Sequence, residues 1–230
     1  MEMEWFPKVY IMCNSKQEPK RYEFLLRHLP QRRIPMDKVV FIEGPWASEI
    51  STETIFKIYD PFFHRLGIEN SLSFKSNCLT KGELSLINTF YKTIQIASEG
   101  EEICLIFESD VILREDFIER LEIVLKDDSE WDYISLGEGC GTRTGFDNSY
   151  FQSQKLFQPG SPFPFRCCDS MLFRKSFLKK LVPTFIPVRE CLDWELDAQI
   201  IHHRGKALWA EPPLVEAATS RSRTASSLPG

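Results

Sequence analysis

Two carboxylates stand two positions apart at Glu108 and Asp110, with Ser109 between them. They directly follow residues 103–107, the clearest β-strand pattern in the chain. In a parallel sheet, ligands bind beyond the carboxyl ends of the strands, where side chains leave the core and converge. A divalent cation lets such carboxylates bind a phosphorylated ligand, because it bridges oxygens of both groups. Taken alone, the same residues also fit a solvated turn or the cap of the acidic helix that follows.

Strand and helix patterns alternate along the chain and define the elements that must position these acids. Short apolar, β-branched runs predict strands at 9–13, 39–42, 103–107, 133–136, 170–173 and 207–210. Helical spacing of apolar residues predicts helices over 19–29, ended by Pro30, and over 81–99, 117–125, 176–181 and 193–203. The segments 46–78 and 139–165 predict long loops, the first with one or two short helices.

This alternation predicts an α/β fold, with a mixed, mainly parallel central sheet flanked by helices. We expect a single domain over residues 1–218, because no linker or internal repeat divides it. The Ser- and Arg-rich residues 219–230 predict a flexible tail.

The composition is that of an ordinary globular protein with a mild negative charge. The chain has 230 residues and a formal net charge of -5, which argues against nucleic-acid binding because phosphate contacts need a dense cationic face. Its seven cysteines are irregularly spaced, which argues against a structural zinc site and favours a reducing compartment. No apolar run reaches membrane-spanning length, and residues 1–7 lack a signal-peptide pattern. The sequence therefore predicts a cytoplasmic protein without a transmembrane segment, or one that associates with membranes only at their surface.

Four segments carry a resemblance to a known family. They are residues 9–14 followed by the basic pair Lys20-Arg21, then Lys81-Gly82-Glu83, then residues 105–111, and finally Leu192-Asp193-Trp194 followed by residues 212–215. In this order they resemble glycosyltransferase family 25, the lipopolysaccharide- and collagen-type sugar transferases, and related transferases encoded by large viruses. The chain departs from the family at Ser109, where Asp is usual, and after Ser85, where a Ser-His pair is usual.

The resemblance implies a GT-A fold that transfers a sugar from a UDP- or GDP-linked donor to a hydroxyl of a glycan acceptor. It makes Glu108-Ser109-Asp110 the counterpart of the D-x-D motif, in which the first acid contacts the ribose and the last, here Asp110, holds Mn²⁺ or Mg²⁺. It also implies inversion, in which the acceptor hydroxyl attacks the anomeric carbon as the nucleoside diphosphate leaves. Such a reaction needs a carboxylate base and a cation at the departing diphosphate.

The start of the last predicted helix supplies the candidate bases. These are Asp193 and Glu195, with Asp197 third. An acid at a helix start is held in place by the free backbone N–H groups of the first turn. The same position suits a plain N-cap aspartate equally well, and the helix pattern does not decide among the three.

The ends of other elements supply candidates for donor binding. Cys13 and Asn14 end the first strand, where a GT-A fold binds the nucleoside, although simple strand termination explains them as well. Lys81 is a candidate for a phosphate contact, and the alternative is a solvated lysine. Glu83 is a candidate for the same site, and the alternative is a capping box with Thr80, three positions earlier.

Two pairs near the carboxyl terminus have weaker claims. His202 or His203 would complete a metal site, although a position at the surface end of a helix is the favoured interpretation. Arg221 and Arg223 would fold over the diphosphate, although a basic tail is the favoured interpretation.

Two other functions remain open. A nucleotidyltransferase would share the fold, but it usually carries a glycine-rich loop after the first strand, and residues 14–17 contain no glycine. A degenerate transferase that acts as a glycan- or protein-binding scaffold is permitted by Ser109 and by the missing Ser-His pair. Substitution of Asp110 by Ala separates enzyme from scaffold, because only an enzyme would lose metal-dependent turnover.

Overall fold

The structure is a computed structural model of the 230-residue chain, and it describes residues 3–61, 78–137, 153–159 and 167–218. The predicted tail over 219–230, with Arg221 and Arg223, lies outside the described residues. So do residues 62–77 of the first predicted loop and most of the second.

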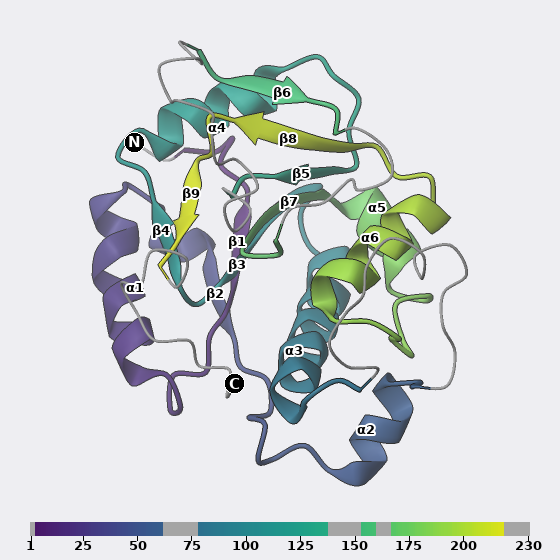
Figure 1. The fold of residues 1–230 in the computed structure, drawn as a ribbon. Helices are drawn as coiled ribbons and strands as arrows, with labels where there is room; N and C mark the ends of the chain where they lie inside the picture. Colours follow the sequence, from purple (N-terminus) through teal and green to yellow (C-terminus); the bar gives the residue numbers. More distant parts are fainter. Residues whose placement is uncertain (1–2, 62–77, 138–152, 160–166, 219–230) are drawn as a thin grey trace.

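A seven-stranded sheet forms the centre of the described chain, in the order β2-β1-β3-β7-β5-β8-β6 (Figure 1). The strands are β1 (Lys8–Met12), β2 (Val39–Ile42), β3 (Ile103–Glu108), β5 (Tyr133–Ser135), β6 (Lys155–Phe157), β7 (Ser170–Arg174) and β8 (Ala207–Glu211). β1 is parallel to β2 and β3, and β5 is parallel to β8, whereas β7 and β6 run antiparallel to their neighbours. The α/β fold with a mixed, mainly parallel sheet is therefore confirmed.

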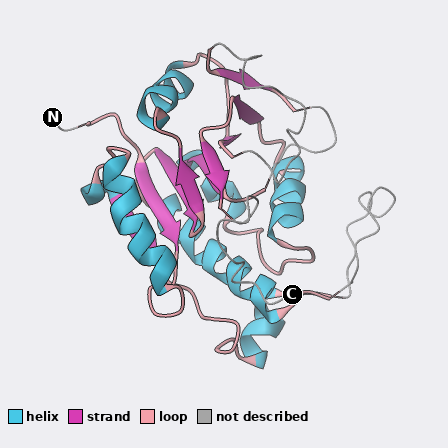
Figure 2. Cartoon of the chain, turned by 60° about the vertical axis from the view of Figure 1, so that its left-hand side comes forward, coloured by secondary structure: helices cyan, strands magenta, loops and turns pink. Residues whose placement is uncertain are grey.

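Helices cover both faces of this sheet (Figures 1 and 2). One face carries α2 (Thr52–Ile58), α3 (Lys81–Ser98), α5 (Lys175–Leu181) and α6 (Leu192–His202), and the other carries α1 (Pro19–Gln31) and α4 (Phe117–Lys126). Successive residues of a strand point to opposite faces of the sheet and so belong to two different hydrophobic cores. On β1, Tyr10 and Met12 pack against α3, whereas Val9 and Ile11 belong to the core under α1. The carboxyl ends of β2, β1 and β3 consequently meet at one edge between these layers.

A second, two-stranded sheet holds the chain that leaves this edge. β4 (Val111–Leu113) begins directly after Asp110 and pairs antiparallel with β9 (Val215–Ala217). The Ala218 N–H donates to the Asp110 carbonyl oxygen at 2.8 Å. The acidic turn is thus fixed on one side by β3 and on the other by a strand from the far end of the described chain.

Most predicted elements are confirmed, with a few differences. α1 runs one residue past Pro30, because Arg32 N–H caps the last carbonyls of the helix at His28 and Leu29 (3.1 and 3.0 Å). Three short strands, β4, β6 and β9, and the 3₁₀ turn η1 (Met36–Lys38) were not predicted, since three residues are too few to give a periodic pattern. Within the described residues, no helix is long and apolar enough to cross a membrane.

Candidate functional site

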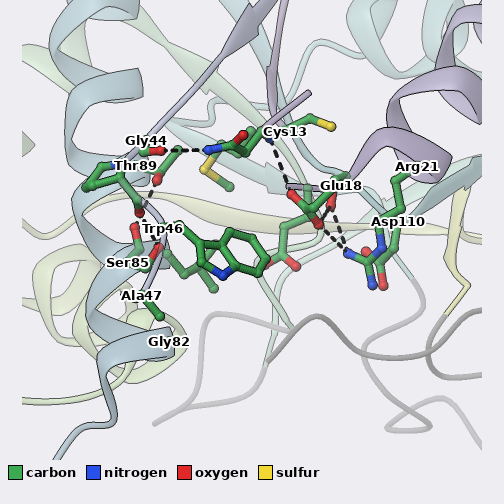
Figure 3. Close-up of a pocket in the computed structure, with 16 residues that line it drawn as sticks. Cys13, Glu18, Arg21, Gly44, Trp46, Ala47, Gly82, Ser85, Thr89 and Asp110 are labelled. Atoms are coloured by element: carbon green, nitrogen blue, oxygen red, sulfur yellow. Dashed lines mark hydrogen bonds and ion pairs between the residues drawn. The ribbon is translucent and has the colours of Figure 1, made fainter. Parts of the chain in front are cut away.

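A pocket lies where the carboxyl ends of β1, β2 and β3 face the first turns of α3 (Figure 3). The space that it encloses together with the solvent at its mouth is about 820 Å³. Each neighbouring element contributes to its wall: residues 13–14 after β1, 44–47 after β2, 108–110 after β3, and side chains of α1 and α3.

Five of the predicted site residues line this pocket together: Cys13, Asn14, Glu108, Ser109 and Asp110. They come from two strands that are far apart in sequence but adjacent in the sheet, with Met12 opposite Glu108 in the parallel register. Ser109 and Asp110 are each 5% exposed, so the turn is packed against the protein rather than solvated. The interpretation of residues 108–110 as an ordinary surface turn therefore does not hold.

The segment after β2 is clamped between β1 and α3, and it places Trp46 in the pocket. Asn14 Nδ2 donates to the Gly44 carbonyl oxygen (3.2 Å), and Ser85 Oγ donates to the Pro45 carbonyl oxygen (2.5 Å). A Cβ at Gly44 would overlap Thr89 Oγ1 and lie 2.7 Å from Thr89 Cβ, so only glycine permits this approach to α3.

Trp46 itself is partly exposed and lies between the α3 side of the pocket and the acidic side (Figure 3). Its backbone N–H donates to Glu49 Oε2 at 2.7 Å, which closes a short turn after the clamp. The indole therefore forms an aromatic wall, and the segment that carries it is held by Asn14 after β1, by Ser85 of α3 and by its own turn at Glu49.

Glu18 and Arg21 bring α1 into contact with the acidic turn. Arg21 Nη1 donates to Glu18 Oε1 (3.1 Å) and to Ser109 Oγ (2.8 Å), and Ser109 Oγ donates to Glu18 Oε1 (2.8 Å). Glu18 Oε2 also accepts from the Asn14 N–H at 3.3 Å. The Glu18 and Arg21 side chains are only 10% and 14% exposed. One carboxylate thus links the end of β1 to the end of β3.

Negative charge is concentrated around Glu108. Burial raises the pKa of the Glu108 carboxyl well above its ordinary value, and the charges of Asp110, Asp193 and Asp169 raise it further, while Arg21 opposes them. Asp169 is held nearby because its backbone oxygen accepts from the Glu108 N–H (2.8 Å). A cation near Glu108 would relieve this repulsion.

The two candidate bases on α6 face different surroundings. Asp193 Oδ1 accepts from the Cys168 N–H (3.1 Å), and burial raises the pKa of Asp193. Glu195 is fully buried, and its carboxylate accepts from the Arg189 N–H (3.0 Å) and from Gln199 Nε2 (3.0 Å). Neither Asp193 nor Glu195 lines the pocket. Only Asp193 acts on the charge of Glu108, so the structure separates the two candidates.

The remaining predicted donor contacts do not line the pocket. Lys81 is an exposed residue of the first turn of α3. Glu83 completes the capping box, because Thr80 N–H donates to Glu83 Oε2 (2.7 Å) and Glu83 N–H donates to Thr80 Oγ1 (3.2 Å). The capping interpretation of Glu83 is therefore confirmed, and its role is to start the helix that walls the pocket. Asp197, the third base candidate, is 1% exposed within α6.

A metal site depends on Asp110, the predicted ligand. Within the described residues, no three His, Cys, Asp or Glu side chains are grouped closely enough to hold an ion by themselves. His202 is exposed, and His203 Nε2 contacts Thr184 Oγ1 (2.7 Å) at the far end of α6. Mg²⁺ commonly binds proteins through one or two carboxylates and takes its other ligands from substrate phosphates and water. Asp110 and Glu108 are the residues that could supply one or two carboxylate ligands of this kind.

Sequence reasoning missed Glu18, Trp46 and Asp169 as site residues, and gave Arg21 no role in the site. Trp46 could have been found, because Gly44-Pro45 ends a predicted strand whose carboxyl end must lie beside that of the first. Glu18 and Arg21 have the i, i+3 spacing of a helical ion pair, but nothing in the pattern directs that pair toward residue 109.

A comparison of the chain with protein-family models finds no match, and a comparison with curated proteins finds none either. The resemblance to glycosyltransferase family 25 therefore stays an expectation drawn from the sequence, and a function has to be inferred from the pocket.

Proposed function

We propose that the chain is a glycosyltransferase that moves a sugar from a nucleotide-sugar donor to a hydroxyl of a glycan acceptor, with the help of a divalent cation. The observation that carries the proposal is the pocket at the carboxyl ends of parallel strands, whose lining joins the Trp46 indole to the carboxylates of Glu108 and Asp110. Trp46 and Asp110 lie apart within it (Figure 3). A nucleoside diphosphate has the matching two parts, an aromatic base and an anionic diphosphate that carboxylates accept only through a cation.

The aromatic side of the pocket binds the nucleoside in this proposal. Trp46 stacks on the base, and the clamp that holds it keeps the indole oriented before the ligand arrives, which lowers the cost of binding. Asn14 and Cys13 border the same space at the end of β1. Because the Asn14 side chain is already bonded to Gly44, Lys16 and Gln17, its contribution is to shape the loop.

The acidic side binds the diphosphate and the transferred sugar. Asp110 is the residue that would hold Mn²⁺ or Mg²⁺, and the ion, when bound, supplies the positive charge that neutralises the departing diphosphate. Glu108 lines the same wall, and its carboxylate becomes easier to ionise wherever positive charge is near. The protein's part is to hold these acids in a partly buried turn, where their charge is poorly screened by water.

Asp193 is the proposed general base. Its pKa is raised by burial, which suits a carboxylate that must take a proton from a sugar hydroxyl near neutral pH. Its position is fixed by the Cys168 N–H and by the first turn of α6. Glu195 has no such role in the proposal, because its carboxylate is occupied in holding residues 189 and 199.

Thermal unfolding with nucleoside diphosphates and nucleotide sugars, with and without Mn²⁺, tests the proposal. A ligand at 100 times its Kd stabilises the native state by roughly 2.7 kcal/mol, and about 2–4 °C per kcal/mol is expected for a chain of this length. We expect a rise of roughly 5–11 °C for one donor base, dependent on Mn²⁺ and lost in Asp110→Asn. The exposed Asp128 provides the matched control, since Asp128→Asn should leave the rise intact.

Trp46→Ala adds a second arm to this test. Stacking of a base on an aromatic side chain is worth about 1–3 kcal/mol, so the variant should lose nucleotide affinity while binding of Mn²⁺ and pyrophosphate is retained. If no donor shifts the melting temperature of the folded wild-type protein, the enzyme proposal fails and the degenerate scaffold takes its place.

A further inference from the structure

Ser109, the middle residue of the acidic turn, is hydrogen-bonded to two charged side chains, Arg21 of α1 and Glu18, which directly precedes that helix. Arg21 Nη1 lies 2.8 Å from Ser109 Oγ, and Glu18 Oε1 lies 2.8 Å from the same atom. Ser109 also lines the pocket and is 5% exposed. Its hydroxyl is therefore held in one orientation at the edge of the space that a ligand would fill.

The chemistry of the two partners decides which way the hydroxyl proton points. An arginine side chain only donates, and an ionised carboxylate only accepts. Ser109 must therefore accept from Arg21 and donate its single proton to Glu18. A serine hydroxyl has one proton and two lone pairs, so one lone pair is left after these two contacts, which are the ones that Ser109 Oγ makes within the described residues.

This fixed polarity limits what Ser109 can recognise. A phosphate oxygen has no proton to give, so it cannot bond to a serine oxygen that offers only a lone pair. A sugar or ribose hydroxyl carries a proton and can donate it. The side chains of Arg21 and Glu18 are only 14% and 10% exposed, so water does not readily replace their hydrogen bonds to Ser109.

We infer that Ser109 is a specificity-determining residue that recognises a hydroxyl group of the nucleotide sugar by accepting a hydrogen bond from it, with Glu18 and Arg21 as the positioning residues that set its polarity. The inference rests on the proposed function. The hydroxyl belongs either to the ribose of the nucleoside or to the transferred sugar, and both sources present the same chemistry.

The test compares ligands that differ in one hydroxyl. Calorimetric Kd values are measured in Mn²⁺ for UDP and GDP and for their 2′-deoxy and 3′-deoxy forms, and for UDP- and GDP-sugars and their deoxysugar forms. Fluoro forms are included because fluorine replaces the oxygen but has no proton to donate. We expect one hydroxyl to matter, with removal weakening binding by about two- to tenfold, the range of a neutral hydrogen bond. The fluoro form of that ligand should be as weak as the deoxy form.

Ser109→Ala should abolish the difference between that hydroxyl ligand and its deoxy form, while Ser109→Thr, which keeps a hydroxyl, should preserve it. The matched control is Ser98→Ala, since Ser98 is a buried serine whose Oγ donates to the Gln95 carbonyl oxygen near the end of α3, away from the pocket. Melting temperatures of all variants establish whether they are folded. If Ser109→Ala does not fold, Ser109→Thr serves as the test, and it should keep the preference for the hydroxyl ligand.

The outcomes separate this inference from the proposed function. If the wild-type protein binds no nucleoside diphosphate or nucleotide sugar, both fall. If it binds them but Ser109→Ala leaves every hydroxyl preference unchanged, only the role of Ser109 falls. If the fluoro form binds as tightly as the hydroxyl form while the deoxy form is weak, Ser109 donates rather than accepts, and the inferred polarity is wrong.

Discussion

Gly44→Ala is the substitution that most sharply tests how the pocket is built. The added methyl would overlap Thr89 Oγ1 and lie 2.7 Å from Thr89 Cβ, closer than real Cβ atoms come to a neighbour, and a tight 3.0 Å from Thr89 Cγ2. The segment after β2 must then move away from α3, and Trp46 moves with it. Overpacking of this kind costs about 1–3 kcal/mol, which corresponds to a fall in melting temperature of roughly 2–12 °C for a chain of this length.

The assay joins stability to ligand binding. Thermal unfolding gives the loss of stability, and calorimetry gives the Kd of the nucleoside diphosphate that the wild-type protein binds best. Gly205→Ala is the matched control, because its Cβ would lie 2.7 Å from ring atoms of Phe177, far from the pocket lining. We expect both variants to melt earlier, but only Gly44→Ala to bind the nucleotide more weakly.

A second substitution tests the cause of the loss. Thr89→Ala removes the two side-chain atoms beyond Cβ that the new methyl would meet, so the double variant should recover part of both stability and affinity. If Gly44→Ala melts within 1 °C or so of the wild-type protein, the close approach of residue 44 to α3 is wrong. If it melts earlier but keeps full affinity, the clamp does not position the aromatic wall.

Two further predictions concern the acids. Because burial and neighbouring charges raise the pKa of Glu108, ionising this carboxyl costs the folded state more than the unfolded state, and its contribution to stability falls as pH rises from the ordinary glutamate value of about 4.3. Glu108→Gln should therefore raise the melting temperature at pH 7 without divalent ions, and this gain should be lost near pH 4. A gain that is equal at both pH values would contradict the cause. Glu195→Ala should lower the stability of the fold by about 1–3 kcal/mol, because the Arg189 N–H loses its acceptor, while nucleotide affinity is kept. Asp193→Asn should keep both an acceptor for the Cys168 N–H and its melting temperature, but it should lose turnover. The reverse pattern would move the base to Glu195.

Much of the fold could be predicted because its signals are local. The strand before Glu108 is an unbroken apolar run, and the helix after Thr80 has both a capping box and regular apolar spacing, so a few neighbouring residues are enough to predict each of them. The acidic turn could be placed by the same logic, since polar residues just beyond a buried parallel strand lie at the edge where ligands bind. β4 and β9 were not predicted, because each has only three residues and their pairing joins residues about a hundred positions apart.

The candidate site was only partly predictable, because its remaining members depend on how elements meet. Trp46 reaches the pocket only because Asn14 and Ser85 hold the segment after β2 from two sides. Asp193 and Glu195 looked equivalent as acids at a helix start, yet two positions along a helix differ by about 200° around its axis. Asp193 consequently lies near enough to Glu108 for its charge to raise the pKa of that carboxyl, whereas the Glu195 carboxylate is hydrogen-bonded to residues 189 and 199. This difference follows from how the helix packs, and the composition gives no sign of it.

The central claim is that the acidic turn supports divalent-dependent cleavage of a nucleotide sugar. The most direct measurement is release of nucleoside diphosphate from UDP- and GDP-sugars in Mn²⁺ or Mg²⁺, compared among the wild-type protein, Asp110→Asn and Asp128→Asn. We predict release by the wild-type protein and by Asp128→Asn that requires the divalent ion and disappears in Asp110→Asn. Release that is unaffected by Asp110→Asn, or none at all from a donor that the folded wild-type protein binds, would contradict the account.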